Sequence, residues 1–149
     1  MRRLEVIPPG VYSGDMMTRT LRTVLVAAIA MVALAACSSG PAKVPAFDGS
    51  HVSASSFAAA VAADGVIVVD VRTPAEYAAG HIPGAINVDV EDASFPNKIA
   101  KLDPAGQYAV YCHSGNRSRA AVDYMTKAGI THTVGLDGGI GAWKGGIQQ

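Results

Sequence analysis

The chain has few cysteines, and they are not arranged for metal binding. Of its 149 residues only two are cysteines, Cys37 and Cys112. They form no C-x-x-C pair, and no cluster of histidines and cysteines has the spacing of metal ligands. We therefore expect no metal site. The two cysteines need not form a disulfide, because each lies in a sequence motif of its own.

An excess of positive charge is also missing. Twelve Lys and Arg residues balance twelve Asp and Glu residues. Four of the basic residues but only two of the acidic ones precede Cys37, which leaves eight basic and ten acidic residues from Cys37 onward. This slightly acidic balance gives no electrostatic basis for nucleic-acid binding, and we expect none.

No apolar stretch is long enough to cross a bilayer. The apolar run Val24–Ala36 has thirteen residues, whereas a transmembrane helix needs about 20. An apolar run of this length after Arg19 and Arg22 is typical of a secretory signal peptide. We therefore predict that residues 1–36 are a signal peptide. Acidic and proline-rich residues ahead of the two arginines fit poorly and favour a translation start at Met16 or Met17.

The apolar run ends in Leu34-Ala35-Ala36-Cys37, which resembles a bacterial lipobox. In that motif the cysteine is lipidated and becomes the first residue of the mature protein. We therefore predict an exported protein, held through Cys37 on the outer face of the bacterial cytoplasmic membrane. An ordinary signal peptide, or a short anchor helix with an incidental cysteine, is the alternative. The small residues and prolines of residues 37–50 predict a flexible spacer.

Residues 51–149 suffice for one domain with one core. Strands are predicted from short β-branched or aromatic runs at residues 66–69, 85–88, 108–111 and 131–134. Helices are predicted after Ser53, over residues 73–77, around residues 99–102 and over residues 118–128. This alternation predicts an α/β fold with a mainly parallel central sheet flanked by helices on both faces. Ligands of such folds bind beyond the carboxyl ends of the strands.

One segment at such a strand end carries the clearest chemical signal. Cys112-His113-Ser114-Gly115-Asn116-Arg117 lies between a predicted strand and a predicted helix. The N–H groups of such a loop converge on an anion, and the helix dipole adds positive potential, so that the pKa of a cysteine there is lowered. Arg117 adds a permanent charge and a planar guanidinium for an oxyanion. Cys112 is therefore the candidate nucleophile, and residues 113–117 are the candidate anion-binding loop.

Three further segments, together with this loop, resemble the landmarks of the rhodanese (sulfurtransferase) family. They are residues 70–77 (DVRTPAEY), 80–87 (GHIPGAIN) and 136–143 (LDGGIGAW). The four segments occur in the order of the family and cover roughly residues 50 to 146. The resemblance implies a single rhodanese-like domain that moves a sulfane sulfur through a persulfide on Cys112. It also implies a small-molecule sulfur donor, a thiol or cyanide acceptor, and no metal or organic cofactor. The charge of Arg117 favours a small anionic donor such as thiosulfate.

The resemblance places Asp70 and Arg72 in a motif that stabilises the fold, so we assign them a supporting role, with substrate contact as the alternative. His81 lies in a predicted turn, and bracing of that turn is favoured over a role as general base. We also expect Glu76 to brace the turn or to lie on a solvated helix face. His113 either changes its charge with pH or faces solvent.

Two other functions share parts of this pattern. A phosphatase or arsenate reductase also surrounds an anion with a cysteine and an arginine, but its loop reads C-x5-R, and here Ser118 occupies the arginine position. The second alternative is a non-catalytic persulfide carrier or interaction module with an unknown protein acceptor. Turnover distinguishes these, because an enzyme cycles with donor and acceptor whereas a carrier loads once.

Overall fold

The structure, a computed structural model, describes residues 43–149. The predicted signal peptide and the lipobox cysteine, Cys37, lie outside the described residues. Within residues 43–149, no helix combines the length and the apolarity that a membrane crossing requires.

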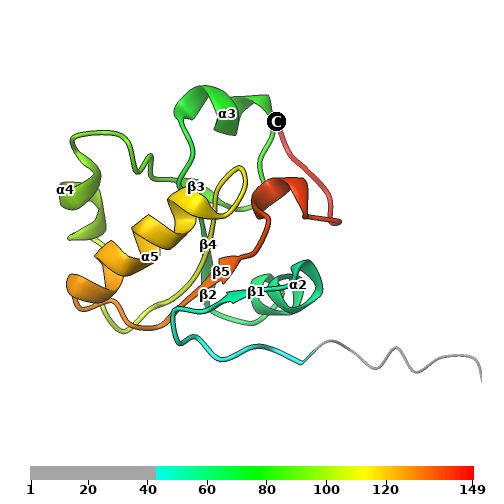
Figure 1. Cartoon of the computed structure of the whole chain (residues 1–149), viewed down its shortest axis with the longest axis horizontal. Helices are drawn as coiled ribbons and strands as arrows, with labels where there is room; N and C mark the ends of the chain where they lie inside the picture. The colour runs from blue at the N-terminus through cyan, green and yellow to red at the C-terminus, as the bar shows by residue number, and fades with distance from the viewer. Residues whose placement is uncertain (1–42) are drawn as a thin grey trace, which may run out of the picture. The chain divides into compact units, whose positions relative to one another are not determined.

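A five-stranded parallel sheet forms the centre of the domain (Figure 1). Its strand order is β1-β5-β4-β2-β3, and every neighbouring pair is parallel. The strands are β1 (His51–Val52), β2 (Val66–Asp70), β3 (Ile86–Asn87), β4 (Gln107–Tyr111) and β5 (Thr133–Leu136). The predicted α/β fold with a parallel central sheet is thereby confirmed. Strand β4 lies at the middle of the sheet.

Helices cover both faces of this sheet. They are α2 (Ala54–Val61), α3 (Pro74–Ala79), α4 (Phe95–Ile99), α5 (Asn116–Lys127) and a 3-10 turn, η1 (Gly139–Gly141). Ser53 and Thr73 cap α2 and α3 by accepting a backbone N–H with their hydroxyls, which is why these two helices begin where they do. Core residues of α4 and α5 pack on one face, and Phe57 of α2 packs on the other.

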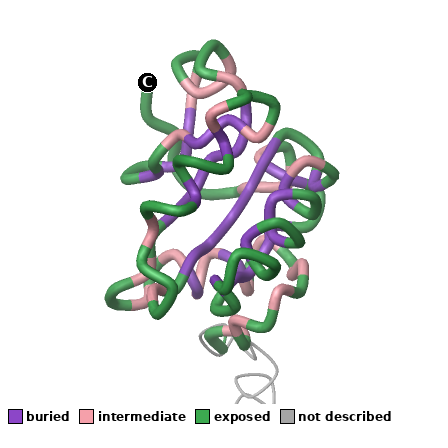
Figure 2. Tube along the Cα trace, turned by 90° about the vertical axis from the view of Figure 1, so that its left-hand side faces the viewer, coloured by how far each residue is buried: buried purple, intermediate pink, exposed green. Residues whose placement is uncertain are grey.

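The two halves of the core meet along β4. Tyr108 and Val110 belong to the cluster under α4 and α5, whereas Ala109 and Tyr111 belong to the cluster under α2. Successive side chains of a strand point to opposite faces, so a central strand is apolar on both. Cys112 continues the alternation on the α5 face and is only 1% exposed. Figure 2 shows how buried positions run through the interior while the outer surfaces of the helices are exposed.

A buried ion pair fixes the chain after β2. Asp70 is fully buried. Its carboxylate accepts one hydrogen bond from Arg72 Nη2, at 2.6 Å, and another from the Arg72 backbone N–H, at 2.9 Å. The same Arg72 Nη2 donates to the Gly80 carbonyl at 2.7 Å, and its guanidinium lies 5.6 Å from the Tyr111 ring centroid. Through Arg72, these contacts join the end of β2 to the residue that ends α3, Gly80.

Some boundaries differ from the sequence-based expectations. Strand β5 begins two residues later than predicted, because Val134 and Leu136 are the residues buried against α2. The two-residue strand β1 was not predicted, since it is too short to show a period. The expected spacer already contacts the domain before its end: Phe47 packs on the α2-side core, and the Gly49 N–H donates to the Thr133 carbonyl at 2.8 Å.

Candidate active site

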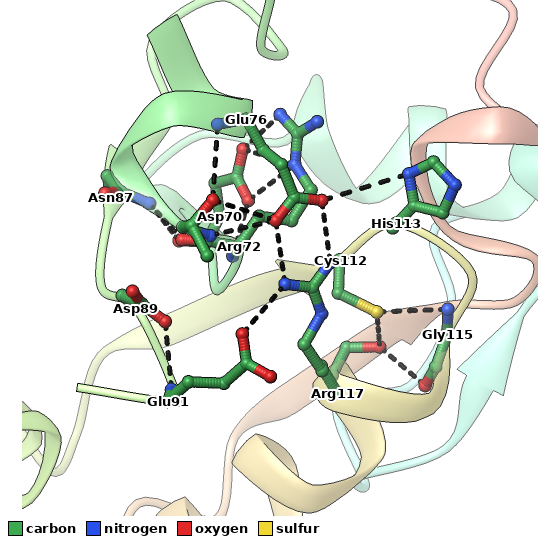
Figure 3. Close-up of polar contacts among 12 residues, drawn as sticks. Asp70, Arg72, Glu76, Asn87, Asp89, Glu91, Cys112, His113, Gly115 and Arg117 are labelled. Atoms are coloured by element: carbon green, nitrogen blue, oxygen red, sulfur yellow. Dashed lines mark hydrogen bonds and ion pairs between the residues drawn. The ribbon is translucent and has the colours of Figure 1, made fainter. Parts of the chain in front are cut away.

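The backbone of the 112–117 loop turns toward the sulfur of Cys112. The Gly115 N–H donates to Cys112 Sγ at 3.0 Å (Figure 3). Gly115 has a φ of +102°, a conformation that favours glycine, and it is the residue from which α5 starts. The sulfur therefore lies between the carboxyl end of β4 and the amino-terminal turn of a twelve-residue helix.

Opposing effects set the pKa of the Cys112 thiol. Burial is the largest and raises the pKa, because an apolar environment disfavours the thiolate. The amide and hydroxyl of Ser118, with the amides of Gly115 and Ser114, stabilise the thiolate and together outweigh burial. The net result is a pKa below the ordinary value for a thiol. The guanidinium of Arg117 acts in the same direction, because it and the Cys112 thiolate attract each other.

The loop is supported from behind by the segment after β5. The Ile140 N–H donates to the Cys112 carbonyl at 2.8 Å. Gly139 has a φ of +61°, and a Cβ at this position would overlap the backbone of His113. Gly139 therefore permits a close backbone approach that holds the loop in place.

The guanidinium of Arg117 is held by carboxylates. Helix α5 begins two residues earlier than predicted, so Arg117 lies in its first turn. Its guanidinium binds Glu76 of α3 through two hydrogen bonds, of 2.7 and 2.8 Å, and Glu91 at 3.3 Å (Figure 3). The hydrogen bonds from Arg117 are the largest cause that lowers the pKa of Glu76 to about 2. The guanidinium that was expected to face an anionic donor is thus paired with two carboxylates.

Glu76 holds α3 and Arg117 together. Its carboxylate accepts the Thr73 N–H at 3.2 Å and the Thr73 hydroxyl at 3.0 Å, which closes a capping box at the start of α3. The expected bracing role of Glu76 matches this position, but the ion pair with Arg117 was not expected.

The other loop residues differ in exposure. The His113 side chain is 70% exposed, and its Nδ1 lies 3.9 Å from Glu76 Oε1. Ser114 is exposed and contributes its amide to the sulfur, and Asn116 is the exposed first residue of α5.

His81 lies in the turn after α3, and its contacts there are with the fold. Its Nδ1 lies 3.0 Å from the Tyr77 carbonyl, and its ring stacks on Tyr77 at 3.8 Å. Its backbone pairs with Gln148 in both directions, at 2.8 Å each. These contacts place His81 as a brace between α3 and the last residues of the chain.

Two residues of the site were not found from the sequence. Ser118 is fully buried, and its Oγ lies 3.6 Å from Cys112 Sγ. His51 of β1 lies behind it, with Nε2 at 2.9 Å from Ser118 Oγ. His51 is 67 positions from Ser118 and belongs to a strand too short to recognise, so no local pattern linked them. Within residues 43–149 no group of three or more His, Cys, Asp or Glu side chains could hold a metal ion.

Comparison of the sequence with known protein families identifies the domain. A sequence model of the rhodanese-like domain matches residues 53–145. The chain belongs to the rhodanese-like domain family. It is 38% identical over 87 residues to the thiosulfate sulfurtransferase GlpE of Pseudomonas entomophila (strain L48), covering 58% of this chain and 78% of that relative. The protein of the same name from Pseudomonas fluorescens (strain SBW25) is 37% identical, with the same coverage.

Solved structures show the same fold. A rhodanese-related protein from Thermoplasma volcanium has 30% sequence identity and a TM-score of 0.58, over 66% of this chain and 96% of that one. The human single-domain sulfurtransferase TSTD1 has 25% identity and a TM-score of 0.54, over 64% of this chain and 97% of that one. The relatives support a sulfurtransferase of the rhodanese type.

The close approach at Gly139 predicts that even a methyl group there disturbs the loop. Gly139→Ala should destabilise the domain by more than the roughly 1–2 kcal/mol cost of a left-handed alanine, and should slow the alkylation of Cys112. Gly129→Ala is the matched control, because Gly129 also has a positive φ, of +91°, but nothing lies within 4 Å of an added Cβ. Denaturant unfolding and iodoacetamide kinetics measure both effects. Equal behaviour of the two variants would contradict a buttressing role for Gly139.

Proposed function

We propose that this rhodanese-like domain is a thiosulfate sulfurtransferase that carries sulfur on Cys112. The observation that carries the proposal is the 3.0 Å hydrogen bond from the Gly115 N–H to Cys112 Sγ, in a loop at the amino terminus of α5. The thiol in this position has a pKa below its ordinary value, and its thiolate accepts from a fixed set of N–H donors. These are the properties of a resting nucleophile that needs no metal and no external cofactor.

The proposed reaction has two displacement steps. The Cys112 thiolate attacks the outer sulfur of thiosulfate, the S–S bond of the donor breaks, and sulfite leaves with the electron pair. Cyanide or a thiolate then attacks the outer sulfur of the Cys112 persulfide, and the cysteine departs as a thiolate. The charge stays on sulfur throughout, so amides that already point to Sγ stabilise every state without reorganisation.

The burial of Cys112 favours a small donor. The residue is 1% exposed, so only a narrow approach to the sulfur is open. A persulfide places its outer sulfur about 2 Å farther from the cysteine. An acceptor therefore needs to penetrate less deeply than the donor, which suits a small donor with acceptors of more varied size.

Arg117 contributes to donor binding in this proposal by exchanging partners. Its guanidinium is held by Glu76 and Glu91, and an incoming sulfonate-like group competes for the same N–H groups. The exchange limits the gain in donor affinity, because one anion replaces another. The loop amides then supply the main interaction with the transferred sulfur, and Arg117 supplies charge at the rim.

The alternatives are less well supported. In a C-x5-R loop an arginine would occupy position 118, and here that position holds a fully buried serine whose hydroxyl lies 3.6 Å from the sulfur. This leaves no guanidinium for a phosphoryl group there. A persulfide carrier would use the same loop, and the absence of turnover with thiosulfate and cyanide would identify it.

We also propose that the domain works at the cell envelope. The support is the apolar run Val24–Ala36 followed by the lipobox-like Leu34-Ala35-Ala36-Cys37. Lipidation of Cys37 would anchor the domain to the outer face of the cytoplasmic membrane, where it would meet small donors from outside the cell.

Cys112 should gain the mass of one sulfur atom, about 32 Da, when the purified protein is incubated with thiosulfate, because the covalent intermediate carries the transferred atom. Cyanide should reverse the gain and release thiocyanate. Cys112→Ser should remain folded and lose essentially all turnover, whereas Cys37→Ser should keep it. Mass spectrometry and a colorimetric thiocyanate assay measure these outcomes. Turnover that persists in Cys112→Ser would refute the mechanism.

Weakening the ion pair between Arg117 and Glu76 should lower the KM for thiosulfate. Glu76→Gln removes one carboxylate charge while its amide oxygen can still accept from Thr73, so we expect a KM for thiosulfate several-fold lower. Arg117→Ala should lower kcat/KM by the equivalent of about 2–4 kcal/mol, with Arg117→Lys between it and the wild type. Steady-state kinetics at constant ionic strength measure this. Lys98→Ala is the control, since Lys98 is a cation that pairs with Asp92 instead. An Arg117→Ala protein with normal kinetics and only a lower melting temperature would show a structural role.

Cys37→Ser should release the protein from the membrane fraction or block its maturation, because the acyl chains would have no attachment site. Fractionation of cells that express the full chain, with mass analysis of the mature amino terminus, measures the outcome. Recovery of the wild-type protein in the cytoplasm with residues 1–36 intact would show that the leader interpretation is wrong.

A further inference from the structure

A buried serine hydroxyl connects the sulfur to a histidine on the opposite side of the active-site loop. Ser118 Oγ has three polar neighbours: Cys112 Sγ at 3.6 Å, the Gly115 carbonyl at 2.9 Å and His51 Nε2 at 2.9 Å. Ser118 is fully buried, so solvent does not compete for its hydroxyl. A line of side chains therefore runs from Cys112 through Ser118 to the half-buried His51.

The fold makes room for this histidine. His51 pairs in register with Gly135 on the neighbouring strand, and a Cβ at Gly135 would overlap the imidazole ring. The ring can lie across β5 only because residue 135 is glycine. It also lines a cavity of about 360 Å³ together with Gly49, Arg119, Val122 and Asp123. The imidazole thus lies between the buried serine and an open cavity.

We propose that His51 acts on Cys112 through Ser118, by taking up the proton that the thiol loses when it becomes the nucleophile. The thiol S–H donates its proton to Ser118 Oγ as the Ser118 O–H passes its own proton to His51 Nε2. One S–H bond and one O–H bond break, and one O–H bond and one N–H bond form. The products are the thiolate, an unchanged serine and an imidazolium, which can release its proton into the cavity.

The hydrogen bonds of the loop permit this transfer. Ser118 has one hydroxyl hydrogen, which points to the Gly115 carbonyl in the resting arrangement. The transfer uses the neutral tautomer of His51 that carries its hydrogen on Nδ1, because Nε2 must accept the proton. When the Ser118 hydroxyl turns toward Nε2, the Gly115 carbonyl keeps the Arg119 N–H as a donor, at 3.2 Å, so no buried acceptor is left unpaired. His51 is a positioning residue in this scheme, because it reaches the reacting sulfur only through Ser118.

The surroundings of His51 keep its imidazole in the neutral form, which can accept a proton. Burial is the largest cause that lowers its pKa, and Arg119 of α5 lowers it further. Asp137, just after β5, and Asp123 of α5 raise it, with the smaller influence. Arg119 and Asp137 pair with each other at 2.7 Å, which offsets much of their opposing action. The net result is a pKa below the ordinary value for histidine, so that the imidazole is neutral near pH 7.

The test is the pH dependence of the alkylation of Cys112 by iodoacetamide, measured on full-length protein by mass spectrometry of the peptide that contains Cys112. Cys37 does not contribute to that signal. His51→Gln should raise the apparent pKa of Cys112 by about one unit, seen as alkylation about tenfold slower near pH 6.5 and unchanged at high pH. His132→Gln is the matched control, because His132 is exposed and lies in the turn before β5. Superimposable profiles for wild type and His51→Gln, or equal shifts in both variants, would overturn the proposal.

A further measurement keeps the test independent of variant stability. In the wild type, the NMR titration midpoint of His51 should shift after Cys112 is alkylated, since the coupling of two sites is reciprocal; an unchanged midpoint would count against the proposal. Ser118→Ala should abolish that shift.

The proposal rests on the proposed function only in taking Cys112 as the nucleophile, and alkylation needs no thiosulfate. A shifted alkylation profile without persulfide formation would refute the thiosulfate reaction alone. Persulfide formation with an unshifted profile would refute the role of His51 alone.

Discussion

The burial of the Cys112 sulfur in an apolar core is the constraint around which the rest of this site is built. Cys112 belongs to the same buried cluster as Val110 and Val122, and burial alone opposes its ionisation. The domain meets this opposition with backbone amides and one hydroxyl, all fixed by the fold. The left-handed Gly115 turns an amide to the sulfur, and Gly139 allows the supporting segment to approach the loop. Glycine is required at both positions for reasons of backbone geometry.

The loop thus separates two electrostatic tasks. Around the sulfur, backbone amides and the Ser118 hydroxyl are the dipoles that lower the pKa of the thiol. At the rim, Arg117, Glu76 and Glu91 form an ion-pair cluster of one positive and two negative charges. In the proposed reaction, a donor would reach Arg117 by exchange with these carboxylates and not by net attraction. Because Glu76 also caps α3, the orientation of that helix and the availability of the arginine are linked.

Much of the fold could be predicted from the sequence, because the buried strands of a parallel sheet are short apolar runs that can be recognised one by one. The runs at Val66–Asp70 and Gln107–Tyr111 are apolar on both faces, and the caps at Ser53 and Thr73 mark helix starts. The location of the cysteine at a strand end followed in the same way. The direction of Arg117 did not, since it depends on where α5 starts and on a carboxylate 41 positions away. Neither did the contact of His51 with Ser118, which depends on a two-residue strand and on the glycine opposite it.

The bridge between His81 and Gln148 has a practical consequence for how this protein is handled. The last residues of the chain pair with the turn after α3, and a Cβ at Gly80 would lie 2.9 Å from the Ile147 side chain. A purification tag or fluorescent fusion joined directly after Gln149 would therefore lie next to the turn that ends α3 and could disturb its pairing. The exposed turn around Pro104 precedes the amino end of β4, whereas Cys112 follows its carboxyl end, so a tag inserted in that turn would lie at the other edge of the sheet.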